Sequence, residues 1–252
     1  MVIESYGKTD RGCVRNENED RILVDDLLGL YLVCDGMGGS SRGDLAAELA
    51  ADAIRYYIDV SSDRYDVSWP FGYSFDLSLD ANRLVTAIRL ANRQVWRRAE
   101  QNLEFAGMGT TVAAVLISNG CAVIANVGDS RVYICREQEL KQLTVDDTMV
   151  ASMVRRGLLP PADAAAHPMR NVVTQAAGSQ EDVEVHLHEH NIATGDVLLI
   201  CSDGLYNPVQ EPDILAALVH GGSPEIAAKQ LVEAAIRWGA PDNVSAVVLR
   251  YS

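Results

Sequence analysis

Residues 31–39 read YLVCDGMGG, an apolar run that ends in an aspartate followed by a cluster of glycines. Such a run predicts a buried β-strand that stops at a turn, because Asp and Gly are typical turn residues. A similar join recurs at 198–205, LLICSDGL, and a related one at 124–131, IANVGDSR. Three joins of one kind in one chain indicate that these strand ends share a purpose.

The segments on either side of this run predict antiparallel strands alternating with amphipathic helices. The strands RILVDD and GLYLVCD are expected to pair around residues 27–29. Apolar residues spaced by three and four predict helices over 43–58 and 78–102, and a weaker helix opens the stretch 145–180. The remaining predicted elements are strands over 110–119, 121–129, 131–137, 181–190, 196–203 and 243–251 and helices over 211–220 and 223–238. This arrangement favours an α+β fold, with antiparallel sheets covered by helices.

Size and composition indicate one ordinary globular domain spanning 1–252, with 48% apolar residues. The net charge of −14 argues against nucleic-acid binding, which favours a basic surface. No apolar run approaches the roughly 18 residues needed to span a bilayer, and MVIESYGKTD lacks the pattern of a leader segment. Five cysteines without CxxC spacing suggest buried, reduced thiols, so we expect a cytoplasmic protein that binds no membrane.

Five aspartates lie at the ends of predicted strands: Asp20, Asp35, Asp129, Asp203 and Asp242. Each one alone is more simply a turn residue, but strands that share sheets can bring their ends to one edge. Clustered carboxylates repel one another and raise one another's pKa, so such a cluster is stable mainly around cations.

The residue types at these strand ends indicate which cation they bind and which reaction it could support. Oxygen ligands without His or Cys favour Mg²⁺ or Mn²⁺ over zinc, and at Gly36 the missing Cβ would let a backbone carbonyl approach a metal. Two such ions could activate a water for attack on a phosphoryl group. Arg15, five residues before Asp20, is a candidate to hold the phosphate through its guanidinium.

Six short motifs resemble those of one known family, in the family's order. They are RNENED at 15–20 for RxxNED, DGMGG at 35–39, MGTT at 108–111, GDSR at 128–131, SDGL at 202–205 and DNV at 242–244. From about residue 7 to 251, the chain resembles a bacterial metal-dependent Ser/Thr protein phosphatase of the PPM, or type 2C, class. Each motif is weak singly, whereas six in order are specific.

The resemblance implies a four-layer αββα sandwich with two Mn²⁺ or Mg²⁺ ions at one end. It implies that Asp35 bridges the two ions, that the Gly36 carbonyl binds one, and that Asp203 and Asp242 bind the other. Asp129, together with Asp203, matches the place where bacterial members bind a weaker third ion.

The resemblance also assigns the residues that serve the reaction. Glu19 and Asp20 would orient metal-bound waters, Asp20 as part of the metal site, and Arg15 would hold the substrate phosphate. Asn243 would hold Asp242 in position without binding a metal itself. The implied activity is hydrolysis of phosphoserine and phosphothreonine in proteins without a covalent intermediate, by a monomer that opposes a Ser/Thr kinase.

The chain departs from the family pattern at three positions. Met37 stands where some members have the His of DGHGG, Ser40 follows DGMGG where many bacterial relatives have His, and Asp147 replaces the His of LTxDH. Because Met cannot act as an acid, metal-bound water is the first candidate for protonating the leaving oxygen and His167 the second. Residues 145–175, the flap, correspond to the family's variable segment and are expected to govern substrate choice.

Two other functions stay open from the sequence. One is a phosphoprotein-binding module that keeps the fold with little or no turnover, which Met37 would allow. The other is a metal phosphohydrolase that acts on small molecules.

Three further features have simpler structural explanations. The histidines of HLHEH, 186–190, could bind zinc, but the interleaved apolar residues predict a buried face and imidazoles that point to water. The stretch WPFGY, 69–73, is either a partner-docking patch or a loop held against the core by its aromatics. The basic segment 88–98 is expected to be an exposed helix face.

Overall fold

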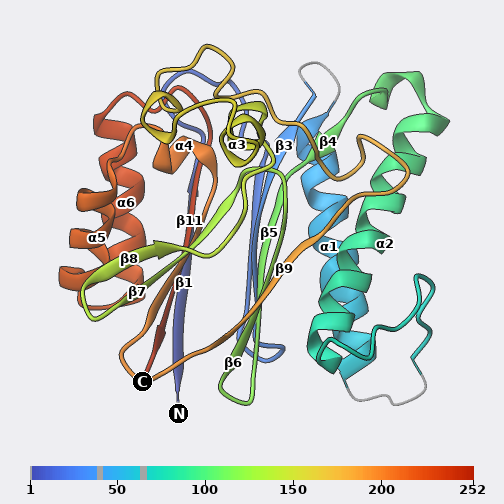
Figure 1. Cartoon of the computed structure of the whole chain (residues 1–252), viewed down its shortest axis with the longest axis horizontal. Helices are drawn as coiled ribbons and strands as arrows, with labels where there is room; N and C mark the ends of the chain where they lie inside the picture. Colours follow the sequence, from blue (N-terminus) through green and yellow to red (C-terminus); the bar gives the residue numbers. More distant parts are fainter. Residues whose placement is uncertain (1, 39–41, 63–66) are drawn as a thin grey trace.

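The computed structural model describes residues 2–38, 42–62 and 67–252. Two antiparallel sheets pack face to face, and helices cover the outer face of each (Figure 1). The predicted α+β sandwich of four layers is therefore confirmed. Gly39 and Ser40 of the sequence motif lie outside the described residues.

Each sheet combines hairpins of consecutive strands with pairings between strands that lie far apart in the chain. The first has the order β1 (Ile3–Asp10), β11 (Val244–Tyr251), β10 (Val197–Cys201), β7 (Arg131–Arg136) and β8 (Glu139–Gln142). The second has the order β2 (Asp20–Asp25), β3 (Leu30–Met37), β5 (Val112–Ser118), β6 (Cys121–Val127) and β9 (His186–Asn191), with β4 (Gly109–Thr110) pairing to the end of β3.

Four longer helices form the outer layers. The second sheet is covered by α1 (Gly43–Ser62) and α2 (Leu79–Gln101), and the first by α5 (Glu211–His220) and α6 (Pro224–Arg237). Shorter turns of helix are η2 (Leu103–Phe105), α3 (Met149–Arg155), η3 (Pro161–Asp163) and α4 (Asp203–Tyr206). Within the described ranges, no helix is long and apolar enough to cross a membrane.

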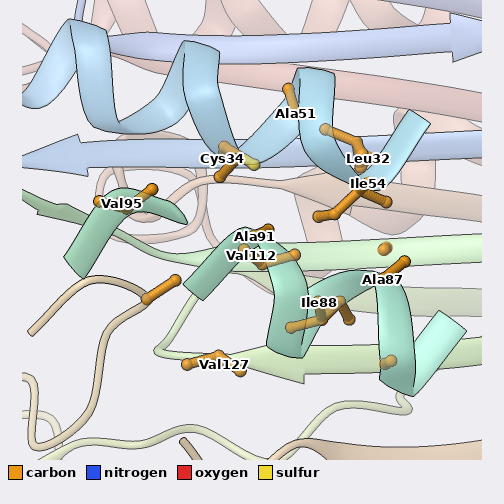
Figure 2. Packing of buried hydrophobic residues seen from close by; sticks show 14 of the residues in the cluster. Leu32, Cys34, Ala51, Ile54, Ala87, Ile88, Ala91, Val95, Val112 and Val127 are labelled. Atoms are coloured by element: carbon orange, nitrogen blue, oxygen red, sulfur yellow. The ribbon is translucent and has the colours of Figure 1, made fainter. Parts of the chain in front are cut away.

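Strand β3 explains why the opening run is apolar at successive positions. Tyr31 and Val33 belong to the core between the two sheets, whereas Leu32 and Cys34 belong to the core under the helices. Figure 2 shows Leu32 and Cys34 under α1, with Leu32 next to Ile54. A strand buried on both faces loses the polar alternation of a surface strand.

Some elements differ from the sequence-based expectation. The expected helix in 145–180 shrinks to the seven residues of α3, and β9 begins at His186 rather than 181. Strand β8 and helix α4 were not predicted. They have four residues each, which is too short for a hydrophobic period to show.

Candidate metal and phosphate site

The register of the two sheets brings the predicted carboxylates to one end of the sandwich. Asp20 pairs directly with Asp35 across β2 and β3, and Asp203 follows β10. A cleft of about 350 Å³ opens there. It is lined by Arg15, Glu19, Asp35, Gly36, Met37, Gly38, Thr111, Asp129, Asn171, Val173, Asp203 and Asp242.

Asp20 lies beneath the cleft, with only 2% of its surface exposed. Its Oδ2 accepts hydrogen bonds from the Ser202 hydroxyl at 2.8 Å and the Ser245 hydroxyl at 2.6 Å. Its Oδ1 is buried and has no hydrogen-bond partner among the described residues. Burial raises the pKa of Asp20 to about 7, although the two hydroxyls oppose this shift. Sequence reasoning missed both serines, whose role depends on contacts across the fold.

The backbone of Asp35 is fixed by two threonines. Its N–H donates to the Thr111 hydroxyl at 3.0 Å, and its carbonyl accepts from Thr111 N–H at 2.8 Å and the Thr110 hydroxyl at 2.9 Å. Thr111 also shares a 2.7 Å hydrogen bond with Ser130, beside Asp129. Burial, and then the charge of Asp20, raise the pKa of the Asp35 carboxyl well above its usual range.

Asp203 and Asp129 are also buried carboxylates. Asp203 Oδ2 accepts from Asn207 Nδ2 at 3.1 Å, whereas its buried Oδ1 has no partner in the described part of the chain. Burial and the nearby Asp242 raise the pKa of Asp203 to about 6. Burial and the nearby Asp203 raise the pKa of Asp129 to about 7. The cleft therefore holds carboxylates whose ionised state is costly without a cation.

Gly36 lines the cleft, but packing gives it a reason that the sequence did not suggest. A Cβ at this position would lie 2.2 Å from the Gly43 carbonyl oxygen at the start of α1, and 2.6 Å from the Glu19 carbonyl oxygen. The close crossing of β3 and α1 therefore requires glycine here. Binding of a metal by the Gly36 carbonyl would be a second reason for glycine at this position.

Arg15 lies at the mouth of the cleft and is half-exposed. Its guanidinium donates to Asp242 Oδ2 at 2.8 Å. Backbone N–H of Asn243 donates to the other Asp242 oxygen at 2.9 Å. The predicted phosphate-binding residue and a predicted metal ligand are thus paired with each other in this structure.

Asn243 joins the amino-terminal loop to the start of β11. Its side-chain amide donates to the carbonyl oxygens of Arg11 and Glu17, and its Oδ1 accepts from Glu19 N–H, all at 2.9 Å. This loop carries Arg15, so Asn243 positions more of the site than the Asp242 carboxylate it was expected to support.

Asp147, which replaces the family's His, holds the flap to the loop that contains Gly128 and Asp129. Its Oδ2 accepts from Gly128 N–H and from Gln175 Nε2, both at 3.0 Å. Its Oδ1 lies 2.7 Å from His186 Nε2. His167, considered above as a proton donor, accepts the Met169 N–H through Nδ1 and is not among the described residues that line the cleft.

The expectation that all three histidines of β9 point to water is wrong. His186 is half-buried and contacts Asp147, and the Nε2 of His190 is buried. His188 and His190 pair with Ile124 and Ala122, which face the other sheet. The apolar residues do lie on a buried face as predicted, but the histidine face of this edge strand is turned toward the first sheet, and of the three histidines only His188 is exposed.

The donor set fits divalent cations that keep part of their water shell. Among residues 2–38, 42–62 and 67–252, no three Asp, Glu, His or Cys side chains converge tightly enough to enclose an ion. Mg²⁺ and Mn²⁺ do not require three enclosing side chains. Both prefer oxygen donors, and Mg²⁺ commonly binds through one or two carboxylates with waters as its other ligands. The unpartnered oxygens of Asp20 and Asp203 are donors of this kind.

Comparisons with known proteins agree with this geometry. The family model described as Protein phosphatase 2C matches residues 15–235. The Ser/Thr protein phosphatase PstP of Mycobacterium tuberculosis is 36% identical over 250 residues, covering 98% of this chain and 45% of PstP. The Ser/Thr phosphatase stp of Listeria welshimeri is 34% identical, covering 96% of this chain and 93% of the relative. The chain thus spans about half the length of PstP but most of the Listeria protein.

Solved structures show the same fold. The crystal structure of the M. tuberculosis phosphatase PstP/Ppp has a TM-score of 0.87 at 34% identity, covering all of both chains. A second structure, the PstP catalytic domain in complex with two manganese ions, has a TM-score of 0.83 at 32% identity, covering 99% of this chain and 98% of that one.

Proposed function

Because the chain belongs to the protein phosphatase 2C family, we propose that it hydrolyses phosphoserine and phosphothreonine esters in proteins with Mn²⁺ or Mg²⁺. The observation that carries the proposal is the pair of buried carboxylate oxygens on Asp20 and Asp203 that have no hydrogen-bond partner among the described residues, in a site whose cleft is also lined by Arg15. Residues 1–252 would act as one catalytic domain, opposing a Ser/Thr kinase. Its unpaired cysteines fit the reducing cytoplasm.

The family pattern assigns the metal ligands, and the residues it assigns all line the cleft. Asp35 and the Gly36 carbonyl would hold one ion, and Asp35, Asp203 and Asp242 the other. Asp129 and Asp203 would hold a weaker third. When bound, such ions supply Lewis-acid chemistry, since they lower the pKa of a water and offset phosphoryl charge.

The chain's own residues would place the reactants. Glu19, which lines the cleft, and the buried Asp20, which pairs with Asp35, would orient water through their carboxylates. Arg15, half-exposed at the mouth, presents a planar guanidinium that can bind two phosphoryl oxygens. A bound phosphate would compete with Asp242 for this guanidinium. Met37 lines the cleft without an ionisable group, so the leaving oxygen would take its proton from water.

Activity measurements test the proposal directly. Purified protein should hydrolyse p-nitrophenyl phosphate and a phosphothreonine peptide with Mn²⁺ and lose activity in EDTA. Asp35→Asn and Asp203→Asn should lose most activity while staying folded by circular dichroism. Full activity in either variant would refute the assignment. Faster turnover of nucleotides or sugar phosphates than of phosphopeptides would favour a small-molecule phosphohydrolase instead.

A further inference from the structure

A groove runs between α1 and α2, apart from the catalytic cleft. Its volume is about 780 Å³, and it shares no lining residue with the cleft. The lining residues are Leu45, Leu49, Ala53, Tyr56, Tyr57, Pro70, Leu90, Arg93, Gln94, Arg97, Arg98 and Gln101. We call this surface the helical groove.

The floor of the helical groove is apolar and follows one face of α1. Leu45, Leu49 and Ala53 are one helical turn apart and half-buried, and Leu90 of α2 also packs against the core from the groove. Tyr56 at the end is 68% exposed. From residue 45 to residue 56 the helix rises about 17 Å. That length matches about three turns of a bound helix.

The wall of the helical groove is positively charged, although the chain carries a net charge of −14. Arg93, Arg97 and Arg98 line it, and no carboxylate does. Arg97 and Arg98 form no ion pair with any residue in the described ranges. Two cations without an ion pair to the described residues, above an apolar floor, complement a ligand that is both acidic and amphipathic.

The loop before α2 helps to fix this wall. The Arg93 guanidinium lies over the Phe71 ring, with its central carbon 4.5 Å from the ring centroid. The same guanidinium lies 3.2 Å from the Asp182 carboxylate. Trp69 and Tyr73 stack edge to face at 5.1 Å. The stretch 69–73 is thus a loop held by its aromatics, and it also orients one cation of the groove.

We propose that the helical groove docks an acidic, amphipathic helical segment of a partner protein. Apolar side chains at i, i+3, i+4 and i+7 would enter the floor, and carboxylates would face Arg97 and Arg98. A bilayer surface fits less well, because it is flat and the apolar residues lie at the bottom of a concavity.

Fluorescence anisotropy of the full chain tests the proposal with a defined probe. The probe is a labelled 16-residue helical peptide with leucines at those spacings and glutamates elsewhere. Its control has lysine at every glutamate. We expect the acidic peptide to bind, and Arg97→Glu to weaken its binding about tenfold. Arg237→Glu, the same charge change on an exposed arginine of α6, should leave binding unchanged.

Several outcomes would overturn the proposal. These are absent binding of the acidic peptide, equal binding of the lysine peptide, and equal effects of the two arginine variants. Binding of phosphatidylglycerol vesicles without peptide binding would assign the surface to membranes. Arg97→Glu should leave p-nitrophenyl phosphate turnover unchanged. Because the anisotropy assay measures binding without catalysis, its result does not depend on the proposed phosphatase activity.

Discussion

Replacing Asn243 tests how the fold positions the amino-terminal loop of the cleft. The side chain is 4% exposed and makes three hydrogen bonds of 2.9 Å, to Arg11, Glu17 and Glu19. Asn243→Ala removes all three. Since a typical hydrogen bond contributes about 0.5–1.5 kcal/mol, and water can rehydrate the exposed carbonyls, we expect a loss of about 2–3 kcal/mol in the free energy of unfolding.

Urea denaturation followed by circular dichroism measures this loss. The midpoint should fall while the slope m stays constant, because the surface exposed on unfolding is unchanged. Asn191→Ala is the matched control: this residue is exposed, and its side chain makes no hydrogen bond to the described residues. The control should stay within about 0.5 kcal/mol of the parent. Turnover of p-nitrophenyl phosphate should fall only in the Asn243 variant, since Arg15 belongs to the released loop. Equal stability of the two variants would refute the reasoning.

Three other changes have distinct expected results. Gly36→Ala places a Cβ 2.2 Å from the Gly43 carbonyl oxygen, so we expect a loss of about 3 kcal/mol in urea titration; unchanged stability would show that α1 moves aside freely. The pKa of Asp20 is raised to about 7, so its stabilising contribution is complete below the unfolded value near 4 and is lost as pH rises through 7. In EDTA the melting temperature should therefore fall between pH 5 and 8, Asp20→Asn should flatten that fall, and a rise with pH would contradict the argument. Asp147→Ala removes the contacts that tie the flap to Gly128 and His186, so hydrogen exchange in the flap should accelerate; unchanged protection there would exclude this anchoring role.

The fold was largely predictable because its signals are local. The β2–β3 hairpin follows from two apolar runs around a short turn, and helices α1 and α2 follow from apolar spacing over many turns. The two faces of β9 were only half predictable. Its sequence shows which residues are apolar, but what lies opposite the histidines depends on how the two sheets stack.

The candidate site was predictable in its residue types but not in its contacts. Aspartates at strand ends converge because antiparallel pairing places Asp20 opposite Asp35. The hydroxyls that hold Asp20 come from Ser202 and Ser245, which are more than 180 residues away in sequence. No spacing pattern in the sequence identifies these serines as partners of Asp20. The pairing of Arg15 with Asp242 is equally long-range.

The charge of the cleft bears on the rival function of phosphoprotein binding without turnover. Six carboxylates line the cleft or lie buried next to it, and Arg15 is the one arginine among its described lining residues. That guanidinium is already engaged by Asp242. A phosphorylated side chain carries a charge of about −1.5 to −2 at pH 7, so without cations it would meet repulsion that a single shared arginine cannot offset. Phosphopeptide binding, and not only hydrolysis, should therefore require Mn²⁺ or Mg²⁺. A module built for metal-free phosphopeptide recognition would instead surround the phosphate with arginines, as phosphate-binding domains do.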